Sequence, residues 1–413
     1  MARMLQQQGG GYVLHVDSTT TKGTPAVLLL KDGWSEVRLL AASIPGETTE
    51  AVSHHLESLR QHLADPLAAI RDMGTGIEAA LKQVFPDTYI LTCHYHFLRN
   101  IGERLFNGVY PSFRVRVNNR GVKKKLRALR KRLFSRSRSD EEEQALKWTA
   151  YLLDYKKDGN GLAYPFTLPE LDFYRRCETL RRPLRRIILS QARKNRSSPA
   201  LSYLENSLRL LRPPPAVVGQ IHAQYLALEE RWEWFERIRK ALRYRNGPVP
   251  LSTERHMSTH ELENGRQKLD ELLAEIREFT LQIGANTHKR SLKRALCSVA
   301  DLIQKRRDEL FAPNVVVEVK GKPLERLLPR TNVPVETDFR RLRRYGRRIR
   351  GDKDVERMVQ RDGVGMAFIL NLENKRYVRL IYGHLDAMAQ KFSSIAPTSK
   401  EKARALMRGS VAN

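Results

Sequence analysis

The chain has 413 residues, 41% of them hydrophobic, which suffices for two folded units or for one domain with a large insertion. Its 74 Lys and Arg against 46 Asp and Glu give a formal net charge of +28, which favours a polyanion such as nucleic acid over an anionic membrane surface. No apolar run approaches the roughly 20 residues that span a bilayer, and no signal peptide precedes the first strand. The three cysteines are far apart in the sequence and make no disulfide framework. We therefore expect a cytoplasmic protein without membrane contact, nucleoid-associated if it is bacterial.

The first third of the chain predicts three strands followed by a helix. Apolar runs at 12–17, 25–31 and 36–41 indicate strands, and Asp32-Gly33 between the last two is a hairpin turn signal. Residues 47–63 then change to helical spacing of their leucines.

Two strand–helix pairs follow. A strand over 67–72 precedes a helix with Thr75 as its predicted cap, and a strand over 88–93 precedes a helix over 94–106. Three meandering strands followed by alternating strands and helices predict an α/β fold with a mixed five-stranded sheet flanked by helices.

The composition changes near residue 107. Residues 114–138 carry twelve Lys and Arg and no acid, residues 140–310 have helical periodicity, and strand-like alternation returns at 314–323 before a basic helix from about 333. We expect a first part of the sheet domain at 1–106, a mainly helical insertion at 107–325, and a final helix with a helical tail at 326–413.

Two carboxylates mark the ends of predicted neighbouring strands. Asp17 lies at the end of strand one and Asp72 at the end of strand four. Such a pair must share a proton or bind a cation, and two carboxylates suit Mg²⁺ or Mn²⁺ together with substrate phosphates. The alternative is that each is an ordinary turn or cap residue.

Three stretches, "HVDST", "IRDMGTGIEAALKQVFPD" and "CHYHFLRNIG", together resemble the catalytic domain of DDE transposases, most closely the Mutator-like group. The resemblance implies an RNase H-like fold interrupted by a helical insertion. It also implies two Mg²⁺ (or Mn²⁺) ions held by Asp17, Asp72 and a third acid on the last helix.

The third acid is assigned by the resemblance to Glu336. "RTNVPVETDFRRLRRYGRRIRG" is similar to the family's T-N-x-x-x-E start of the final helix, although the family's second Asn is a Val here. Glu254, which also follows a polar break, is the second choice. An acid in the first turn of a helix also stabilises the helix dipole, so a purely structural role is the alternative.

Cys93 and His96 match the family's C-x2-H pair, which implies that they shape the active site. Half of a zinc site and simple packing are the alternatives, and no second pair lies at zinc-ligand spacing.

Two basic segments are predicted to hold the DNA backbone, although a run of charge is also typical of a solvated helix face. Trp234 lies off the main apolar stripe of its helix, and the resemblance makes it a candidate for base stacking, with core packing as the alternative. The predicted DNA-binding residues are Arg340, Arg341, Arg343, Arg344, Arg347, Arg348, Lys123, Lys124, Lys125 and Arg127.

The resemblance thus predicts a DNA transposase that cleaves element ends, transfers the freed 3′-hydroxyl into double-stranded target DNA, and acts as a homodimer or higher oligomer. Strand one begins close to Met1, so we expect an N-terminally truncated form without the usual upstream DNA-binding domain. The alternatives are an RNase H-like nuclease or resolvase without strand transfer, an inactive DNA-binding derivative, and an RNA-binding protein.

Overall fold

The computed structural model divides the chain into two compact units, which are described one by one. It describes residues 10–19, 25–134, 139–156, 163–212, 215–243, 256–283, 289–319, 321–351, 359, 365–384, 386–395 and 397–398. The first unit comprises residues 1–97, 249–268 and 305–413, and the second comprises 98–248 and 269–304. Residues 249–268 and 305–325, which the sequence analysis assigns to the insertion, therefore fall in the first unit.

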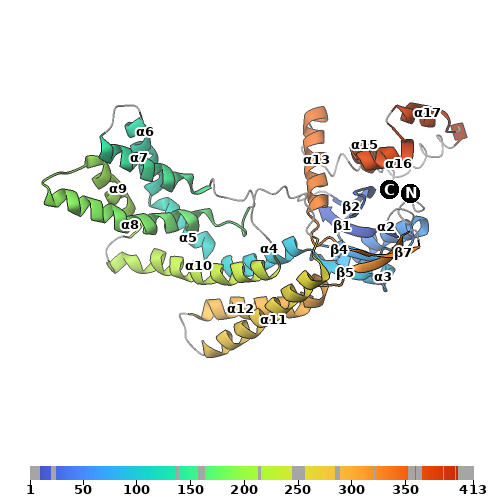
Figure 1. The fold of residues 1–413 in the computed structure, drawn as a ribbon, viewed down its shortest axis with the longest axis horizontal. Helices are drawn as coiled ribbons and strands as arrows, with labels where there is room; N and C mark the ends of the chain where they lie inside the picture. Colours follow the sequence, from blue (N-terminus) through green and yellow to red (C-terminus); the bar gives the residue numbers. More distant parts are fainter. Residues whose placement is uncertain are drawn as a thin grey trace. The chain divides into compact units, whose positions relative to one another are not determined.

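The first unit carries all the strands of the described chain (Figure 1). Its elements are β1 (Val13–Thr19), β2 (Ala26–Asp32), β3 (Arg38–Ile44), α2 (Thr49–His62), β4 (Ala68–Arg71), α3 (Thr75–Val84), β5 (Tyr89–Thr92), β6 (Val315–Val319), β7 (Lys322–Arg326), α13 (Val333–Arg350), α15 (Gly365–Leu372), α16 (Lys375–Tyr382) and α17 (Ala387–Ser393).

The second unit is helical in its described part. It contains α5 (Tyr110–Asn119), α6 (Val122–Phe134), α7 (Asp140–Leu153), the short 3₁₀ helix η1 (Asp154–Lys156), α8 (Pro169–Arg193), α9 (Pro199–Arg209) and α10 (Pro215–Ala241). Three helices cross the boundary between the units: α4 (His94–Phe106), α11 (Thr259–Gln282) and α12 (Arg290–Leu310). No helix in the described ranges is both long and apolar enough to cross a membrane.

The central sheet is mixed and has the order β3-β2-β1-β4-β5. The first three strands are antiparallel neighbours, and β4 and β5 run parallel to β1. A separate antiparallel hairpin joins β6 to β7. The α/β class and the mixed five-stranded sheet flanked by helices, both predicted from the sequence, are therefore confirmed.

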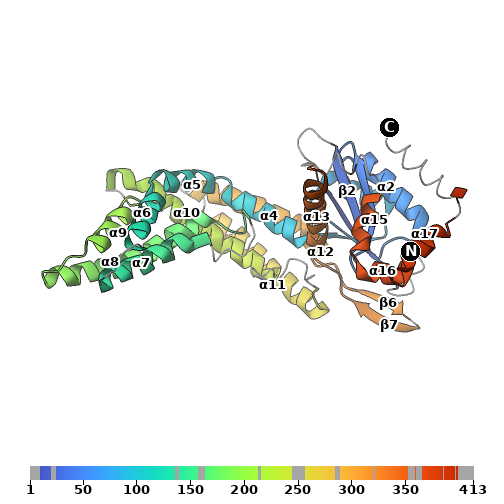
Figure 2. The ribbon, with the colours of Figure 1, turned by 90° about the horizontal axis from the view of Figure 1, so that it is seen from above.

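Strand periodicity separates the two faces of this sheet, because successive side chains of a strand point to opposite sides. Leu14 and Val16 of β1 pack with α2 and α3 in one apolar cluster, whereas Val13 packs with β6 on the opposite face. On that opposite face Leu29 of β2 packs with α13 and α15. Figure 2 shows these two helices against the sheet. The odd-numbered residues of β1, Asp17 included, therefore belong to the face that α13 covers.

The turn between β2 and β3 is longer than the predicted two-residue hairpin. The Asp32 carboxylate accepts hydrogen bonds from the backbone N–H groups of Trp34 (3.3 Å) and Ser35 (2.9 Å), and Glu36 has a positive φ of 58°. This side-chain capping replaces ladder pairing, so β3 starts at Arg38 instead of the predicted position 36.

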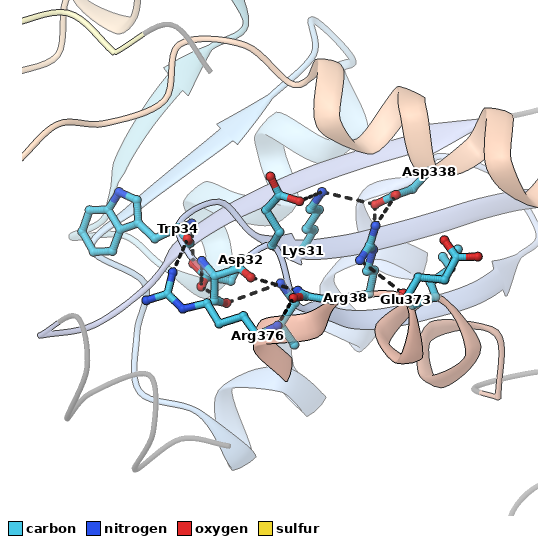
Figure 3. Close-up of polar contacts among 12 residues, drawn as sticks. Lys31, Asp32, Trp34, Arg38, Asp338, Glu373 and Arg376 are labelled. Atoms are coloured by element: carbon cyan, nitrogen blue, oxygen red, sulfur yellow. Dashed lines mark hydrogen bonds and ion pairs between the residues drawn. The ribbon is translucent and has the colours of Figure 1, made fainter. Parts of the chain in front are cut away.

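A buried ionic network fastens α13 to the sheet (Figure 3). Asp338 of α13 accepts a hydrogen bond from Arg38 Nε at 2.9 Å and a second from Arg38 Nη2, and Lys31 Nζ lies 3.4 Å from the same carboxylate. Asn371 of α15 exchanges two 2.8 Å hydrogen bonds with the Arg38 backbone. The charges compensate one another out of water, so these contacts define the placement of α13 on β2 and β3.

Candidate active site

Asp17 and Asp72 come from neighbouring parallel strands. The register pairs Val16 of β1 with Arg71 of β4. Asp17 follows Val16 within β1, and Asp72 follows Arg71, the last residue of β4. Asp17 is 4% exposed and accepts a 2.9 Å hydrogen bond from Ser18 N, and Asp72 accepts one of 2.9 Å from Gly74 N. Asp17 lies two residues before the end of β1 rather than at its last residue.

The turn after Asp72 differs from the prediction in one detail. Thr75 is the first residue of α3, and Gly74 occupies the cap position without a side-chain hydrogen bond. The Asp72 carboxylate supplies the local acceptor, because it binds the Gly74 N–H. The predicted capping role of Thr75 is therefore wrong.

Glu336 lies in the first turn of α13 and faces His96 of α4. Its Oε1 atom is 3.0 Å from His96 Nε2, with the side chains 28% and 16% exposed, respectively. Burial lowers the pKa of His96, but Cys93, Glu336 and Asp17 outweigh it and hold that pKa well above its ordinary value. Glu336 and Asp17, two of the predicted catalytic acids, thus favour the protonated form of His96.

A hydrogen-bonded network around Asn332 brings Glu336 to the sheet. The Asn332 N–H donates to Cys93 Sγ at 3.1 Å, its side-chain amide donates to Val16 O at 2.8 Å, and its Oδ1 lies 2.8 Å from His15 Nδ1. The Asn332 carbonyl in turn accepts from the Glu336 N–H at 3.4 Å. Cys93 and His96 therefore both contact the segment that starts α13.

The other two predicted acids influence Asp17 electrostatically. Burial raises the pKa of Asp17 well above its usual range; His96 partly opposes this, whereas Asp72 and Glu336 raise the value further. A buried carboxylate near two others is costly to ionise unless a cation joins them.

A further carboxylate, Glu47, lies beside Asp72 and was missed by the sequence analysis. Ser18 Oγ donates a hydrogen bond to Glu47 Oε2. A Cβ built on Gly74 would be 1.9 Å from Glu47 Oε1 and 3.0 Å from Asp72 Oδ1, so a side chain at position 74 would displace the Glu47 carboxylate. Burial raises the pKa of Glu47, the Ser18 hydrogen bond opposes this, and Asp72 adds to the rise.

Glu47 gives little signal in the sequence because it lies in a loop, directly before the Thr48 cap of α2. An acid there is typical of a residue that stabilises the helix dipole. The sequence feature that could have indicated a partner such as Glu47 is the hydroxyl of Ser18, one residue after Asp17.

An ion-pair network around Arg71 holds the backbone at Asp72. Arg71 is fully buried, donates to the Asp72 carbonyl at 2.6 Å and pairs with Glu78 and Glu309 at 2.9 Å each. Arg306 also pairs with Glu78, at 2.7 Å, and such interactions bring the pKa of Glu78 to about 2 against the opposing effect of its burial. These contacts connect β4, α3 and α12 and fix the strand end that carries Asp72.

The donor chemistry of the site suits a hard cation, although the protein by itself does not complete a cage. Carboxylate oxygens are the ligands that Mg²⁺ prefers, and one or two of them commonly suffice when substrate phosphates and water supply the rest. Within the described ranges, no group of three or more His, Cys, Asp and Glu side chains could hold a metal ion. A cation bound by these carboxylates would therefore take its remaining ligands from water or from a substrate.

The α13 arginines divide between structural contacts and solvent. Arg343 donates to Thr19 Oγ1 at 2.6 Å, and Arg341 lies 3.9 Å from Asp338 and 3.8 Å from Glu373. The apolar side chains of α13 pack on the sheet. The remaining predicted phosphate-binding residues of this helix are exposed; they are Arg340, Arg344, Arg347 and Arg348.

One of the predicted DNA-binding residues of α6 has a structural contact instead. Lys123 is not on a solvated face: its Nζ lies 3.2 Å from Glu170 and 4.7 Å from the Tyr155 ring centre. Lys124, Lys125 and Arg127 of the same helix are exposed. The pattern did not reveal Glu170, because that carboxylate comes from α8.

Trp234 is buried, with 8% of its surface exposed, and packs on Phe279 of α11 at 5.6 Å between ring centres. This placement favours the core-packing alternative over base stacking. Trp232 of the same helix is the more exposed of the two and stacks on Phe106. Trp234 therefore belongs to the buried face of α10, which is wider than the predicted stripe. Glu254, the second choice for the third acid, lies outside the described residues.

Comparison with known proteins adds no family assignment. No protein-family model matches the chain, and no curated protein matches it.

Proposed function

We propose that the first unit is an RNase H-like catalytic domain of a Mutator-like DDE transposase, and that the helical segment between β5 and β6 is an insertion in that domain. The observation that supports this most strongly is the placement of Asp17 and Asp72 on neighbouring parallel strands, β1 and the end of β4, with Glu336 in the first turn of the helix α13 that packs on the sheet. Acids at the ends of adjacent parallel strands, facing an acid on a helix across the same sheet face, are a suitable arrangement for divalent-cation chemistry on phosphodiesters.

In the proposed reaction the chain cleaves a DNA strand at an element end and joins the freed 3′-hydroxyl to target DNA. Asp17, Asp72 and Glu336 would hold the two Mg²⁺ ions, which activate the attacking oxygen and stabilise the leaving oxygen when bound. The exposed α13 arginines would hold the DNA backbone beside these acids, because guanidinium groups bind phosphates through two parallel hydrogen bonds. Duplex DNA is therefore the proposed partner, and an oligomer that joins two element ends the proposed assembly.

The test of this proposal replaces each acid by its amide. We expect Asp17→Asn, Asp72→Asn and Glu336→Gln each to reduce Mg²⁺-dependent cleavage of a duplex by ~100-fold or more, since cation-mediated stabilisation contributes several kcal/mol to the transition state. Binding of the same DNA should stay within about twofold, because the backbone contacts remain. Unreduced cleavage in any of the three variants would remove that residue from the catalytic set.

A catalytically inactive DNA-binding protein is the second candidate function. It is favoured by the 3.0 Å contact of His96 with Glu336 and by the lack of a preformed three-ligand metal group among the residues with described positions. Cleavage by the unmodified chain in Mg²⁺ or Mn²⁺ decides against it. A strand-transfer assay on precleaved ends then distinguishes the transposase from a nuclease or resolvase.

A further inference from the structure

The C-terminal half of α8 in the second unit presents a row of arginines that the proposed active site does not use. Leu180 and Leu184 of this helix are buried, and Ile187 and Ile188 are half-buried. The opposite side of the same turns is exposed to solvent. We call it the outward face of α8; it consists of Arg182, Arg185, Arg186, Leu189 and Arg193.

The arginines along α8 fall into two groups with different surroundings. Arg175 pairs with Glu229 at 2.6 Å, and Arg181 pairs with Glu178 at 2.7 Å. The four arginines of the outward face take part in no ion pair within the described part of the chain. The sequence explains the contrast, because residues 179–204 contain no Asp or Glu.

A structural role does not account for this row. Arg193 lies in the last turn, where a cation stabilises the helix dipole. Arg182, Arg185 and Arg186 lie two turns or more before that end, and they face one another at spacings of three and four residues, at which like charges destabilise a helix. An anion alongside the helix would remove this repulsion.

We propose that the outward face of α8 is a second DNA-binding surface, which holds the backbone of duplex DNA independently of the acids in the first unit. Arg182 and Arg193 are separated by about 16 Å along the helix axis, a length over which a duplex presents several phosphates. The face carries no aromatic side chain on which an unpaired base would stack, so it fits a duplex backbone better than a single strand. The choice of DNA among polyanions rests on the proposed function.

The test compares two charge-matched double variants of the full chain. Arg185→Gln with Arg186→Gln removes two charges from the outward face. Arg290→Gln with Arg294→Gln removes two from exposed positions four residues apart on α12. Binding of a fluorescent duplex of random sequence is measured by anisotropy without divalent cations, between about 50 and 200 mM salt.

We expect the α8 variant to lower the slope of log K against log salt concentration by about 2, since each lost phosphate contact accounts for about 0.9. The α12 variant should leave the slope unchanged. Equal slopes for the two variants would overturn the proposal. If the first α8 variant fails to fold, Arg182→Gln with Arg193→Gln replaces it, and an undiminished slope for that pair would also overturn the proposal. Tighter binding of a single strand or of duplex RNA, equally dependent on Arg185 and Arg186, would overturn duplex DNA as the partner.

The outcome is separable from that of the proposed function. A chain that cleaves no DNA, or that cleaves equally well after Asp17→Asn, contradicts the transposase proposal but leaves the salt slope as an independent measurement. Conversely, active cleavage with an α8-independent slope would leave the catalytic proposal standing and remove this surface.

Discussion

At the residue scale, Glu47 is the group whose role the geometry changes most. Its carboxylate lies between Ser18 and Asp72, and the glycine at position 74 leaves room for it. A loop residue before a capped helix would ordinarily be assigned to the helix dipole. Because Glu47 accepts the hydrogen bond of Ser18, the residue after the proposed catalytic Asp17, we expect it to act as a positioning residue for that acid.

We expect Glu47→Gln to lower Mg²⁺-dependent cleavage by roughly 10-fold or more, the usual cost of losing a group that orients a metal ligand. The free energy of unfolding at pH 7 should not fall, because the raised pKa of Glu47 means that folding disfavours its ionised form and glutamine still accepts the Ser18 hydrogen bond. Chemical denaturation and a cleavage assay check both parts. The exposed neighbour Glu50→Gln is the matched control and should change neither; a parallel loss of stability and cleavage in Glu47→Gln would indicate a structural role only.

His15 is a buried neutral histidine beneath the same site. Burial, aided by Lys31 and opposed by the Asn332 hydrogen bond, lowers its pKa to about 4 from 6.5. A lowered folded-state pKa contributes stability above pH 6.5, and this stability is lost as the pH falls toward 4.

We therefore expect the free energy of unfolding to include a contribution from His15 of about 3 kcal/mol that disappears between pH 6.5 and 4. His15→Asn, which keeps a donor to Asn332 Oδ1, should remove this part of the pH dependence. Urea unfolding at several pH values measures it, with exposed His260→Asn as the control. An unchanged pH profile in His15→Asn would contradict the assignment.

At the element scale, the attachment of α13 decides whether the third acid reaches the sheet. The helix is tied at its start by Asn332 to β1 and at its second turn by Asp338 to Arg38 and Lys31. All three charged side chains of this second contact are at most 3% exposed.

Removing the Asp338 charge should destabilise the protein strongly, because it leaves Arg38 buried without this counter-ion and leaves Lys31 with only the 4.0 Å contact to the exposed side chain of Glu36. We expect Asp338→Asn to cost about 3–5 kcal/mol in the free energy of unfolding. Glu373→Gln removes a carboxylate from an exposed pair with Arg341 and should cost no more than about 0.5 kcal/mol. Denaturant titration of both variants provides the measurement, and similar losses for the two would show that the buried network does not anchor α13.

At the scale of the whole molecule, the net charge of +28 does not lie entirely on the surface, because some Lys and Arg side chains are held in ion pairs. Lys31, Arg38 and Arg71 are buried in ion pairs of the first unit, and Lys123 is paired in the second. A count of basic residues therefore overstates the surface available to a polyanion. The exposed parts of α6, α8 and α13 are the segments on which DNA-binding experiments should concentrate.

The sequence by itself determined the order and type of the sheet elements, the placement of Asp17 and Asp72 near adjacent strand ends, and the helix that begins beside Glu336. These follow from local periodicity and turn chemistry, which act over a few residues. The roles of Glu47, Lys123 and Trp234 were decided only by the tertiary structure. Each contacts a partner from a different element, namely Ser18, Glu170 and Phe279. A local sequence pattern does not indicate which elements pack against each other.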